Sequence, residues 1–399
     1  MKKIRNIVLV LALLSVVSIV SFKSGQKSEG TLVGNQNQMD LSLMWKVKDK
    51  ISSLYLDKDK VDQQKMTYGA IQGMVASLDD PYTVFLPPSA NKNSNEDLAG
   101  EFGGVGIQLG YTDDILSVMA PLPKTPAAKA GIEAKDLILK ITDKANNVDR
   151  DTNGISLSEA VDLIRGKIGT DVTLKMFRKG KDAPFDVTLK RDNIVVPSAE
   201  LEWKEIGSKK IAWVRLSKFT ERLYQEWPEV VDKINEDKKT NKNFGGVVLD
   251  LRNNPGGFLD ASVMVASDLL SDGVVVKQQS SDGKVEIYSI DKSKGALIND
   301  KLVVLVNGGS ASAAEILAGA LKDYNRAKLV GEKTFGKGTV QAPEQFSDGS
   351  GLHVTIAKWL LPNGNNIHKI GVDPDVEVKN DSNQKEDLQL NKAIEVLSQ

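Results

Sequence analysis

Residues 302–321 have the sequence LVVLVNGGSASAAEILAGAL, and this segment decides the predicted fold. The apolar run Leu302–Val306 is typical of a buried strand, and the alanine-rich stretch Ala313–Leu321 is typical of a helix. Other short apolar runs alternate with helical stretches along the chain: Ile211–Leu216, Tyr224–Glu236, Gly246–Leu251, Ala261–Leu270 and Val274–Lys277. Strands that alternate with helices predict an α/β core whose sheet is largely covered by helices.

The rest of the chain has different patterns. Apolar residues recur at helical spacing between residues 40 and 78, which predicts two or three helices. Short strands and two helical stretches follow the glycine-rich segment at Phe102, and they predict a small, mostly β domain. The boundaries that we predict are 1–25 for a targeting segment, 26–39 for a linker, 40–97 for a helical region, 98–193 for the β domain, 194–380 for the α/β core and 381–399 for a C-terminal amphipathic helix.

The N-terminus has the features of a targeting segment. Lys2, Lys3 and Arg5 precede an apolar run, Ile7–Phe22, that is interrupted only by serines. A positive start followed by an apolar stretch is typical of a signal peptide. No clean cleavage site distinguishes a cleaved signal from a retained membrane anchor, and either alternative places the rest of the chain outside the cytoplasm.

The composition excludes several kinds of active site. The chain has no cysteine, which removes thiol catalysis, disulfides and thiolate metal sites. It has only two histidines, His353 and His368, and no H-E-x-x-H motif, so a zinc hydrolase built on histidines is not expected. The formal net charge of -1 argues against a nucleic-acid partner. A serine nucleophile here needs one of the two histidines or a base of another kind.

Ser312 lies where the strand of the opening segment turns into its helix. A serine at such a turn is exposed, and the helix N-terminus offers N–H groups and partial positive charge to a developing oxyanion. Ser312 and Glu315 also form the pattern of a capping box, which is a purely structural way to begin a helix. On this segment alone, both interpretations of Ser312 stay open.

A second segment, Val330–Gln341, favours the catalytic interpretation. It places Lys337 between two glycines, which allow tight turns and a close approach to another element. A lysine is a general base for serine only when it is neutral, and burial lowers its pKa in the required direction. Gln341 is a candidate to orient this lysine by a hydrogen bond.

Two alternatives compete with a catalytic role for Lys337. An exposed turn is the usual place of a lysine. The spacing Gly331-x4-Gly336-Lys337 also resembles a phosphate-binding loop, but that motif requires Ser or Thr directly after the lysine, where Gly338 stands. The motif further requires a helix next, whereas residues 339–343 have an extended pattern.

A third segment, Val247–Gly257, is an apolar strand followed by the turn Pro255-Gly256-Gly257. N–H groups of consecutive glycines can donate to an oxyanion, although a simple strand-ending turn has the same pattern. Together and in this order, the three segments resemble the C-terminal processing peptidases, the tail-specific Ser/Lys proteases of family S41. The likeness covers roughly residues 40 to 395 and includes motifs at 69–74, 77–82, 102–109, 125–131, 360–364 and 371–375.

This resemblance implies a fold and a set of site residues. The fold is α/β, with a crotonase-like or ClpP-like serine protease core, an inserted PDZ domain at 98–193 and an N-terminal helical region. No metal or nucleotide cofactor is implied. The two histidines match no catalytic position of the family, and we expect them to be structural or on the surface. The implied residues are the nucleophile Ser312, the base Lys337, its helper Gln341, and oxyanion donors at the amides of Ala313 and of Gly257, with Gly256 as the alternative to Gly257.

The PDZ domain implied by the resemblance has its own site. Such a domain holds a peptide by strand addition, and the N–H groups of a glycine loop capture the terminal carboxylate. The residues that resemble this loop are Gly104, Val105, Gly106 and Ile107. Arg165 resembles a family arginine that contacts the protease core in the active enzyme, although a solvated charge at a helix end has the same pattern.

The sequence therefore predicts an extracytoplasmic serine endopeptidase that cleaves protein substrates at or near their C-termini. The expected partners are proteins or peptides with apolar C-termini, and a membrane as well if the N-terminal segment is a retained anchor rather than a cleaved signal. The helical ends at 40–78 and 385–397 are candidates for a homodimer contact, as in some relatives. Two alternatives remain: a PDZ peptide-binding scaffold that does not cut, and a protease that stays inactive until its PDZ domain moves.

Overall fold

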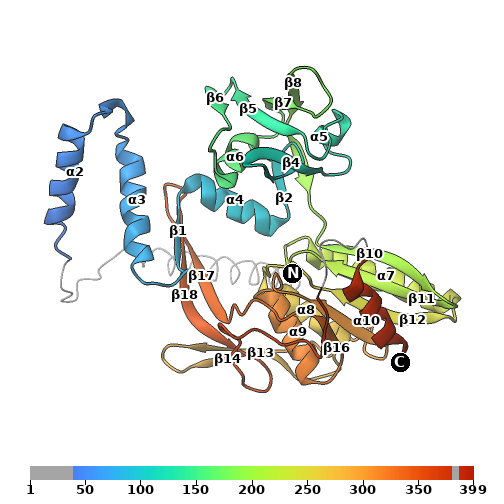
Figure 1. Ribbon diagram of the computed structural model, residues 1–399. Helices are drawn as coiled ribbons and strands as arrows, with labels where there is room; N and C mark the ends of the chain where they lie inside the picture. The colour runs from blue at the N-terminus through green and yellow to red at the C-terminus, as the bar shows by residue number, and fades with distance from the viewer. Residues whose placement is uncertain (1–38, 380–385) are drawn as a thin grey trace, which may run out of the picture. The chain divides into compact units, whose positions relative to one another are not determined.

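The structure is a computed structural model that describes residues 39–379 and 386–399 (Figure 1). The predicted targeting segment at 1–25, and the linker as far as residue 38, lie outside these residues. In the described parts of the chain, we find no helix that is both long and apolar enough to cross a membrane. The chain divides after Thr67 into two compact units, which we describe separately.

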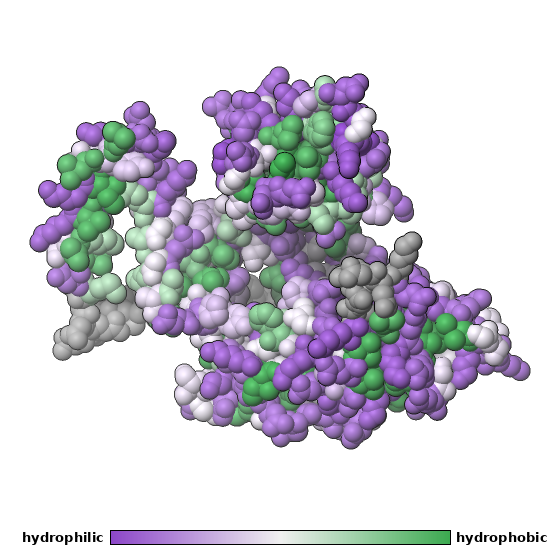
Figure 2. Space-filling model, viewed as in Figure 1, coloured by the Kyte–Doolittle hydropathy of each residue, from purple (hydrophilic) through white to green (hydrophobic). Residues whose placement is uncertain are grey.

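The first unit is helical. Its elements are α2 (Ser42–Leu54), the short 3-10 helix η2 (Lys58–Lys60) and the beginning of α3 (Gln63–Ala76), which confirms the helices predicted between residues 40 and 78. No residue of α2 is buried. Its exposed apolar side chains, visible as a hydrophobic stripe in Figure 2, include Leu43, Met44, Trp45, Val47, Ile51 and Leu54. The apolar side chains whose spacing predicts this helix are therefore not packed in a core within the first unit.

The second unit contains the β domain as an insertion. Its sheet is antiparallel, in the order β3-β4-β5-β7-β8 with β6 beside β5, and one apolar cluster fills its interior. The elements are β3 (Ile107–Thr112), β4 (Ile115–Pro121), α5 (Pro126–Lys129), β5 (Leu137–Asp143), β6 (Val148–Asp151), α6 (Leu157–Ile164), β7 (Asp171–Phe177) and β8 (Phe185–Lys190). The chain enters through β2 (Glu101–Gly104) and leaves through β9 (Asp192–Val195), and these two strands pair with each other. This pairing closes the domain at its base.

The α/β core is built on a six-stranded sheet in the order β10-β11-β12-β15-β16-β19. All neighbours from β11 onward are parallel, and β10 is antiparallel to β11. The strands are β10 (Ala199–Ile206), β11 (Lys209–Leu216), β12 (Phe244–Asp250), β15 (Leu302–Val306), β16 (Lys328–Gly331) and β19 (Val376–Glu377).

Helices cover both faces of this sheet, as the alternation of strands and helices predicted. On β12, Val247 and Leu249 point into the cluster formed with α7, α8 and α9, whereas Val248 points to α10 on the other face. The helices are α7 (Leu223–Thr240), α8 (Leu259–Leu269), α9 (Ala313–Asp323) and α10 (Leu388–Ser398). Burial on both faces explains why these strands are continuous apolar runs.

A second sheet has the order β1-β18-β13-β14, and β17 pairs with β18. Its strands are β1 (Val84–Leu86), β13 (Val274–Ser280), β14 (Val285–Ser289), β17 (Thr339–Gln345) and β18 (Gly351–Leu360). Strand β1 comes from the segment ahead of the β domain and adds to β18 in antiparallel register, with Val84 opposite His353. Helix α4 (Pro88–Ala99) then leads from β1 to β2. The inserted domain is thus flanked on both sides by parts of the core.

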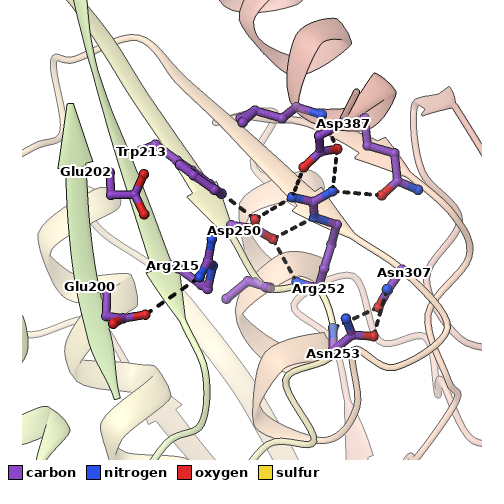
Figure 3. Close-up of polar contacts among 12 residues, drawn as sticks. Glu200, Glu202, Trp213, Arg215, Asp250, Arg252, Asn253, Asn307 and Asp387 are labelled. Carbon is purple, nitrogen blue, oxygen red and sulfur yellow. Dashed lines mark hydrogen bonds and ion pairs between the residues drawn. The ribbon is translucent and has the colours of Figure 1, made fainter. Parts of the chain in front are cut away.

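The C-terminal helix is fastened to the core by a charged cluster (Figure 3). Arg252, just after β12, donates to Asp250 at 2.7 Å and to Asp387 at 2.8 Å. Asp387 is the N-cap of α10, where its side chain accepts from the amide of Leu390. The indole of Trp213 also donates to Asp250, at 3.1 Å.

Candidate active site

Ser312 is the residue before α9, and its backbone is strained. Its φ of 55° lies in the left-handed region that residues other than glycine rarely adopt. Such a conformation persists only where the surroundings over-determine it, and it is common at functional sites. Strand β15 before the turn is buried throughout, and α9 is buried from Ala313 to Leu321. The two elements leave Ser312 half-buried at the edge of the core.

The neighbouring Ser310 has a structural role. It is fully buried, and its hydroxyl donates to the carbonyl of Leu251 at 2.7 Å and accepts from the amide of Asn307 at 3.0 Å. Asn253 and Asn307 join the same two loops: the side-chain oxygen of Asn307 accepts from the backbone amide of Asn253, and its side-chain nitrogen donates to the side-chain oxygen of Asn253, both at 2.9 Å (Figure 3). These contacts hold the loop before the glycine turn against the loop before Ser312.

The buried carboxylate of Glu315 connects the segment of Ser312 to that of Lys337. One oxygen accepts from the amides of Ser312 and Lys337, at 3.0 and 2.9 Å. The other accepts from the amide of Gly336 at 2.7 Å and from the hydroxyl of Thr334 at 2.5 Å. Glu315 therefore begins the helix, as the capping-box pattern indicates, and also binds the lysine loop. The local pattern carried no signal for this second role, because the loop comes about twenty residues later.

Lys337 is half-buried, and its amine lies 5.2 Å from the centre of the Tyr82 ring. Burial lowers the pKa of this amine below its usual value, against the opposing charges of Asp80 and Glu315. Within 39–379 and 386–399, no carboxylate forms an ion pair with it. Strand β17 begins two residues later, so the phosphate-loop alternative, which needs a helix there, is wrong.

Gly338 shows why a glycine follows this lysine. A Cβ atom at this position would lie 2.3 Å from the backbone nitrogen of His368. No side chain fits in that space, so only glycine allows the lysine loop to approach the segment of His368. The lysine loop therefore approaches another element closely, as the glycines beside Lys337 predicted.

The glycine turn after β12 offers one free donor. The amide of Gly256 donates to the side chain of Asn254 at 2.9 Å. Gly257 has a φ of +134°, and a Cβ there would lie 2.1 Å from the carbonyl oxygen of Phe219, so glycine is required. In the described parts of the chain, neither the amide of Gly257 nor that of Ala313 has an acceptor. Free N–H groups of this kind are what an oxyanion hole needs, and they favour Gly257 over Gly256.

Gln341 is held by two threonines. Its amide nitrogen donates to the hydroxyls of Thr339 at 3.0 Å and of Thr355 at 3.1 Å. No hydrogen bond joins Gln341 to Lys337 among the residues that the structure describes. With the nitrogen engaged in this way, the side-chain oxygen is the atom left to accept from a lysine amine.

A single cavity of about 870 Å³ brings most of these groups together. Its lining includes Gly257, Ser312, Lys337, Thr339, Gln341 and His353 from the core, and Val161 and Arg165 from the β domain. His353 thus lies in the cavity, and its pKa is lowered by burial and by the charge of Lys337. The sequence predicted only a structural or surface position for His353. In the described ranges, no cluster of His, Asp or Glu suited to a metal ion is present.

The predicted PDZ site is organised around the first strand of the β domain. Gly104, Val105 and Gly106 lead into β3, which starts at Ile107. Among the described residues, β3 is at an edge of the sheet and pairs only with β4, so its other side is open to strand addition. Val105 is buried, and its carbonyl accepts from the amide of Ala127 at the start of α5.

Arg165, at the end of α6, binds outside the α/β core. Its guanidinium donates to Asp97 of α4 at 2.9 Å and lies 3.8 Å from the ring centre of Phe102 on β2. The amine of Lys218, which comes from the core, is close to the same pair. Burial lowers its pKa, the charge of Arg165 lowers it further, and Asp97 opposes both.

Fold and site together define a serine-type peptidase with a PDZ domain. Three family models match the chain: "Peptidase family S41" over residues 210–378, "PDZ domain" over 103–189 and "Activating protease CtpB N-terminal domain" over 16–89. The chain is 36% identical, over 356 residues, to the carboxy-terminal processing protease CtpA of Bacillus subtilis (strain 168). That match covers 89% of this chain and 71% of the relative. The chain belongs to the carboxy-terminal processing proteases of peptidase family S41.

Other comparisons agree with this family. A probable CtpA-like serine protease of Staphylococcus aureus (strain COL) is 38% identical over 373 residues, covering 93% of this chain and 70% of the relative. Among solved structures, the photosystem II D1 C-terminal processing protease is 31% identical with a TM-score of 0.53, and the match covers 90% of this chain and 97% of that one. A putative S41 protease from Bacteroides fragilis NCTC 9343, 17% identical with a TM-score of 0.56 over 88% and 96% of the two chains, shares the fold.

Proposed function

We propose that this peptidase uses a Ser312–Lys337 dyad to cleave protein substrates at or near their C-termini. The observation that carries the proposal is the shared cavity, in which a strained serine, a half-buried lysine without an ion-pair partner in the described chain, and the free amide of Gly257 line one space. Each of these features is what the corresponding chemical role requires.

The reaction runs through an acyl-enzyme. Neutral Lys337 takes the proton of the Ser312 hydroxyl as its oxygen attacks the peptide carbonyl, and the amides of Gly257 and Ala313 donate to the resulting oxyanion. When the intermediate collapses, the C–N bond breaks and the leaving amine takes the proton back from the Lys337 ammonium. Lys337 then accepts a proton from water as the water oxygen attacks the ester. The bond between the acyl carbon and the Ser312 oxygen breaks, and the Lys337 ammonium returns the proton to that oxygen. Gln341 orients the lysine through its free side-chain oxygen.

The PDZ domain supplies the substrate. A substrate chain with an apolar C-terminus adds as a strand to the open edge of β3, and its carboxylate binds at Gly104–Ile107. Helix α6 of this domain lines the same cavity as Ser312, which supports delivery of the bound chain to the dyad. Arg165 binds Asp97 and not the core. Because a movement of the PDZ domain would change this contact, activity can be controlled through the position of the domain.

We place the enzyme outside the cytoplasm, on the evidence of the charged and apolar pattern at residues 1–25. We also propose a homodimer that uses the exposed apolar side chains of α2. Helix α10 is not expected to take part through its apolar residues, because Leu390, Ala393 and Ile394 are already buried against the sheet.

The test is degradation of casein by a chain that lacks residues 1–25, beside its Ser312→Ala and Lys337→Ala variants. We expect the parent to degrade casein and both variants to be inactive while they keep the melting temperature of a folded protein. Equal activity in Ser312→Ala would contradict the nucleophile. A parent that stays inactive, even with a peptide that has an apolar C-terminus, would favour a binding scaffold that does not cut.

A further inference from the structure

The turn Asp80-Pro81-Tyr82 lies beside Lys337 although it belongs to neither the PDZ domain nor the segment matched as S41 peptidase. The ring of Tyr82 is within the distance at which a cation and an aromatic face attract each other. The negative charge of Asp80 raises the pKa of Lys337, which opposes the lowering of that pKa by burial. More than 250 residues separate this turn from the lysine, so no local pattern connects them.

The turn is fixed to the sheet that carries Gln341. Strand β1, directly after it, pairs with β18. Thr83 donates through its hydroxyl to Asp80 at 2.7 Å, and the same oxygen accepts from the amide of Thr355 on β18 at 3.0 Å. The turn is thus attached through both a strand ladder and a side chain, and its place relative to the lysine loop is well defined.

A polar path runs from Asp80 to Gln341 through Thr83 and Thr355. The hydroxyl of Thr83 donates to the Asp80 carboxylate at 2.7 Å and accepts from the amide of Thr355. The hydroxyl of Thr355 itself accepts from the Gln341 amide nitrogen at 3.1 Å. Thr355 also contributes to the lowered pKa of Asp80. This arrangement sets the orientation of the Gln341 amide and leaves its oxygen for Lys337.

The titratable groups around Lys337 come from three elements. They are Asp80 and Tyr82 on the turn, Glu315 on α9 and His353 on β18. Four donors already surround the oxygens of Glu315, whereas Asp80 is tied to the turn itself and to β18. Burial raises the pKa of Asp80, but the hydrogen bonds of Thr355, Thr83 and Tyr82 and the charge of His368 outweigh burial and keep it ionised.

We propose that Asp80 and Tyr82 are positioning residues of the active site, so that the segment before the PDZ domain completes the catalytic centre. Asp80 orients Gln341 through Thr355 and stabilises the ammonium that Lys337 becomes when it takes the serine proton, and the Tyr82 ring packs against that ammonium. This inference rests on the proposed Ser312–Lys337 dyad. It assigns Asp80 the part that a buried carboxylate has beside a catalytic histidine.

The first test compares pH profiles of kcat for Asp80→Asn and for its matched control, Asp79→Asn. Asp79 is exposed and in the left-handed region, which Asn accepts readily. Loss of the Asp80 charge makes Lys337 a weaker base, so its protonation limb moves to lower pH and the plateau of kcat falls by about tenfold, with KM unchanged. The control keeps the parent profile. Tyr82→Phe keeps the ring and the profile, whereas Tyr82→Leu lowers kcat.

A second measurement does not depend on catalysis. In the Ser312→Ala background, the pKa of Lys337 is measured by competitive labelling of lysine amines with acetic anhydride, quantified by mass spectrometry across a pH series. We expect a lower pKa in Asp80→Asn than in Asp79→Asn. Equal pKa values and equal kcat profiles for these two variants, with Ser312→Ala and Lys337→Ala both inactive, overturn the inference and leave the dyad in place. Activity in Ser312→Ala overturns the dyad instead, and the labelling result still decides whether Asp80 acts on Lys337.

Discussion

Arg252 and Lys337 are both cations withdrawn from water, and the protein treats them in opposite ways. Burial alone would lower the pKa of either group. At Arg252, the hydrogen bonds that its guanidinium donates to Asp250 and Asp387 outweigh burial and raise its pKa far above the usual value. At Lys337 the nearby charges make no ion pair in the described chain, so burial prevails and the pKa falls. The partners, rather than burial, decide whether a cation is a permanent structural charge or a group that can exchange a proton.

The largest expected effect comes from replacing Lys337 by arginine, so that the active site holds a permanent cation as the Arg252 cluster does. Lys337→Arg keeps the positive charge, but a guanidinium does not lose its proton in a protein. Since the base is then absent, kcat/KM for a peptide substrate should fall by at least about 10⁴-fold. Lys333→Arg is the matched control, because Lys333 is an exposed member of the same loop. Comparable activity in both variants would mean that Lys337 is not the base.

The second prediction removes the structural cation. In Arg252→Met, the buried Asp250 loses its counter-charge, and unfolding in urea should show a loss of about 3–5 kcal/mol. The control is Arg215→Met, because Arg215 is half-exposed and lies 3.7 Å from Glu200, so its loss should cost less than about 1 kcal/mol (Figure 3). Equal losses for the two arginines would mean that the buried ion pair of Arg252 contributes no more to stability than the exposed pair of Arg215.

The third prediction concerns Glu315, whose carboxylate oxygens accept four hydrogen bonds from the serine and lysine segments. In Glu315→Gln, the new NH2 group faces N–H or O–H donors where an oxygen accepted before, so at least one contact is lost. We expect a loss of about 2–3 kcal/mol in stability, and a fall in kcat with little change in KM. The exposed Glu344→Gln serves for comparison. A variant as stable and active as Glu344→Gln would show that Glu315 does not join the two segments.

The smallest expected effect is a gain in stability. Lys337→Met removes an ammonium that burial disfavours, and at neutral pH it should stabilise the fold by about 0.5–2 kcal/mol. The folded pKa of Lys337 lies below 10.5, so between the two values the unfolded chain binds more protons than the folded one. The destabilisation of the fold by Lys337 is therefore fully present below its folded pKa, and it is lost as the pH rises through that pKa to 10.5. Thermal melts of both proteins across this range test the prediction, and a constant difference would contradict it.

Local patterns were enough to predict the buried central elements of the core. The apolar runs at 302–306 and 246–251 and the helical stretch at 261–270 correspond to β15, β12 and α8 within a residue or two. These strands are buried on both faces, so their composition is distinctive. Strand β1 and the antiparallel β10 were not predicted. Both contain polar or half-exposed residues, which weaken the apolar signal.

The residues of the site that lie in sequence motifs could be predicted from the sequence. Ser312, Lys337 and Gln341 were identified as candidates from their segments, and their presence in one cavity is consistent with that choice. The preference for Gly257 came from the resemblance, and the hydrogen bond of the Gly256 amide to Asn254 now supports it. The position of His353 in the cavity and the approach of Tyr82 to Lys337 had no counterpart in any motif.

The sequence by itself determined the class of the fold, the order of the domains and the chemical types available for catalysis, because those depend on apolar periodicity and on the residues present. Only the tertiary structure decided which charges act on Lys337, that Glu315 joins the serine and lysine segments, and that the turn of Asp80 reaches the active site. Those relations depend on distances between residues far apart in the chain, and electrostatic and hydrogen-bond energies are set by such distances and by burial.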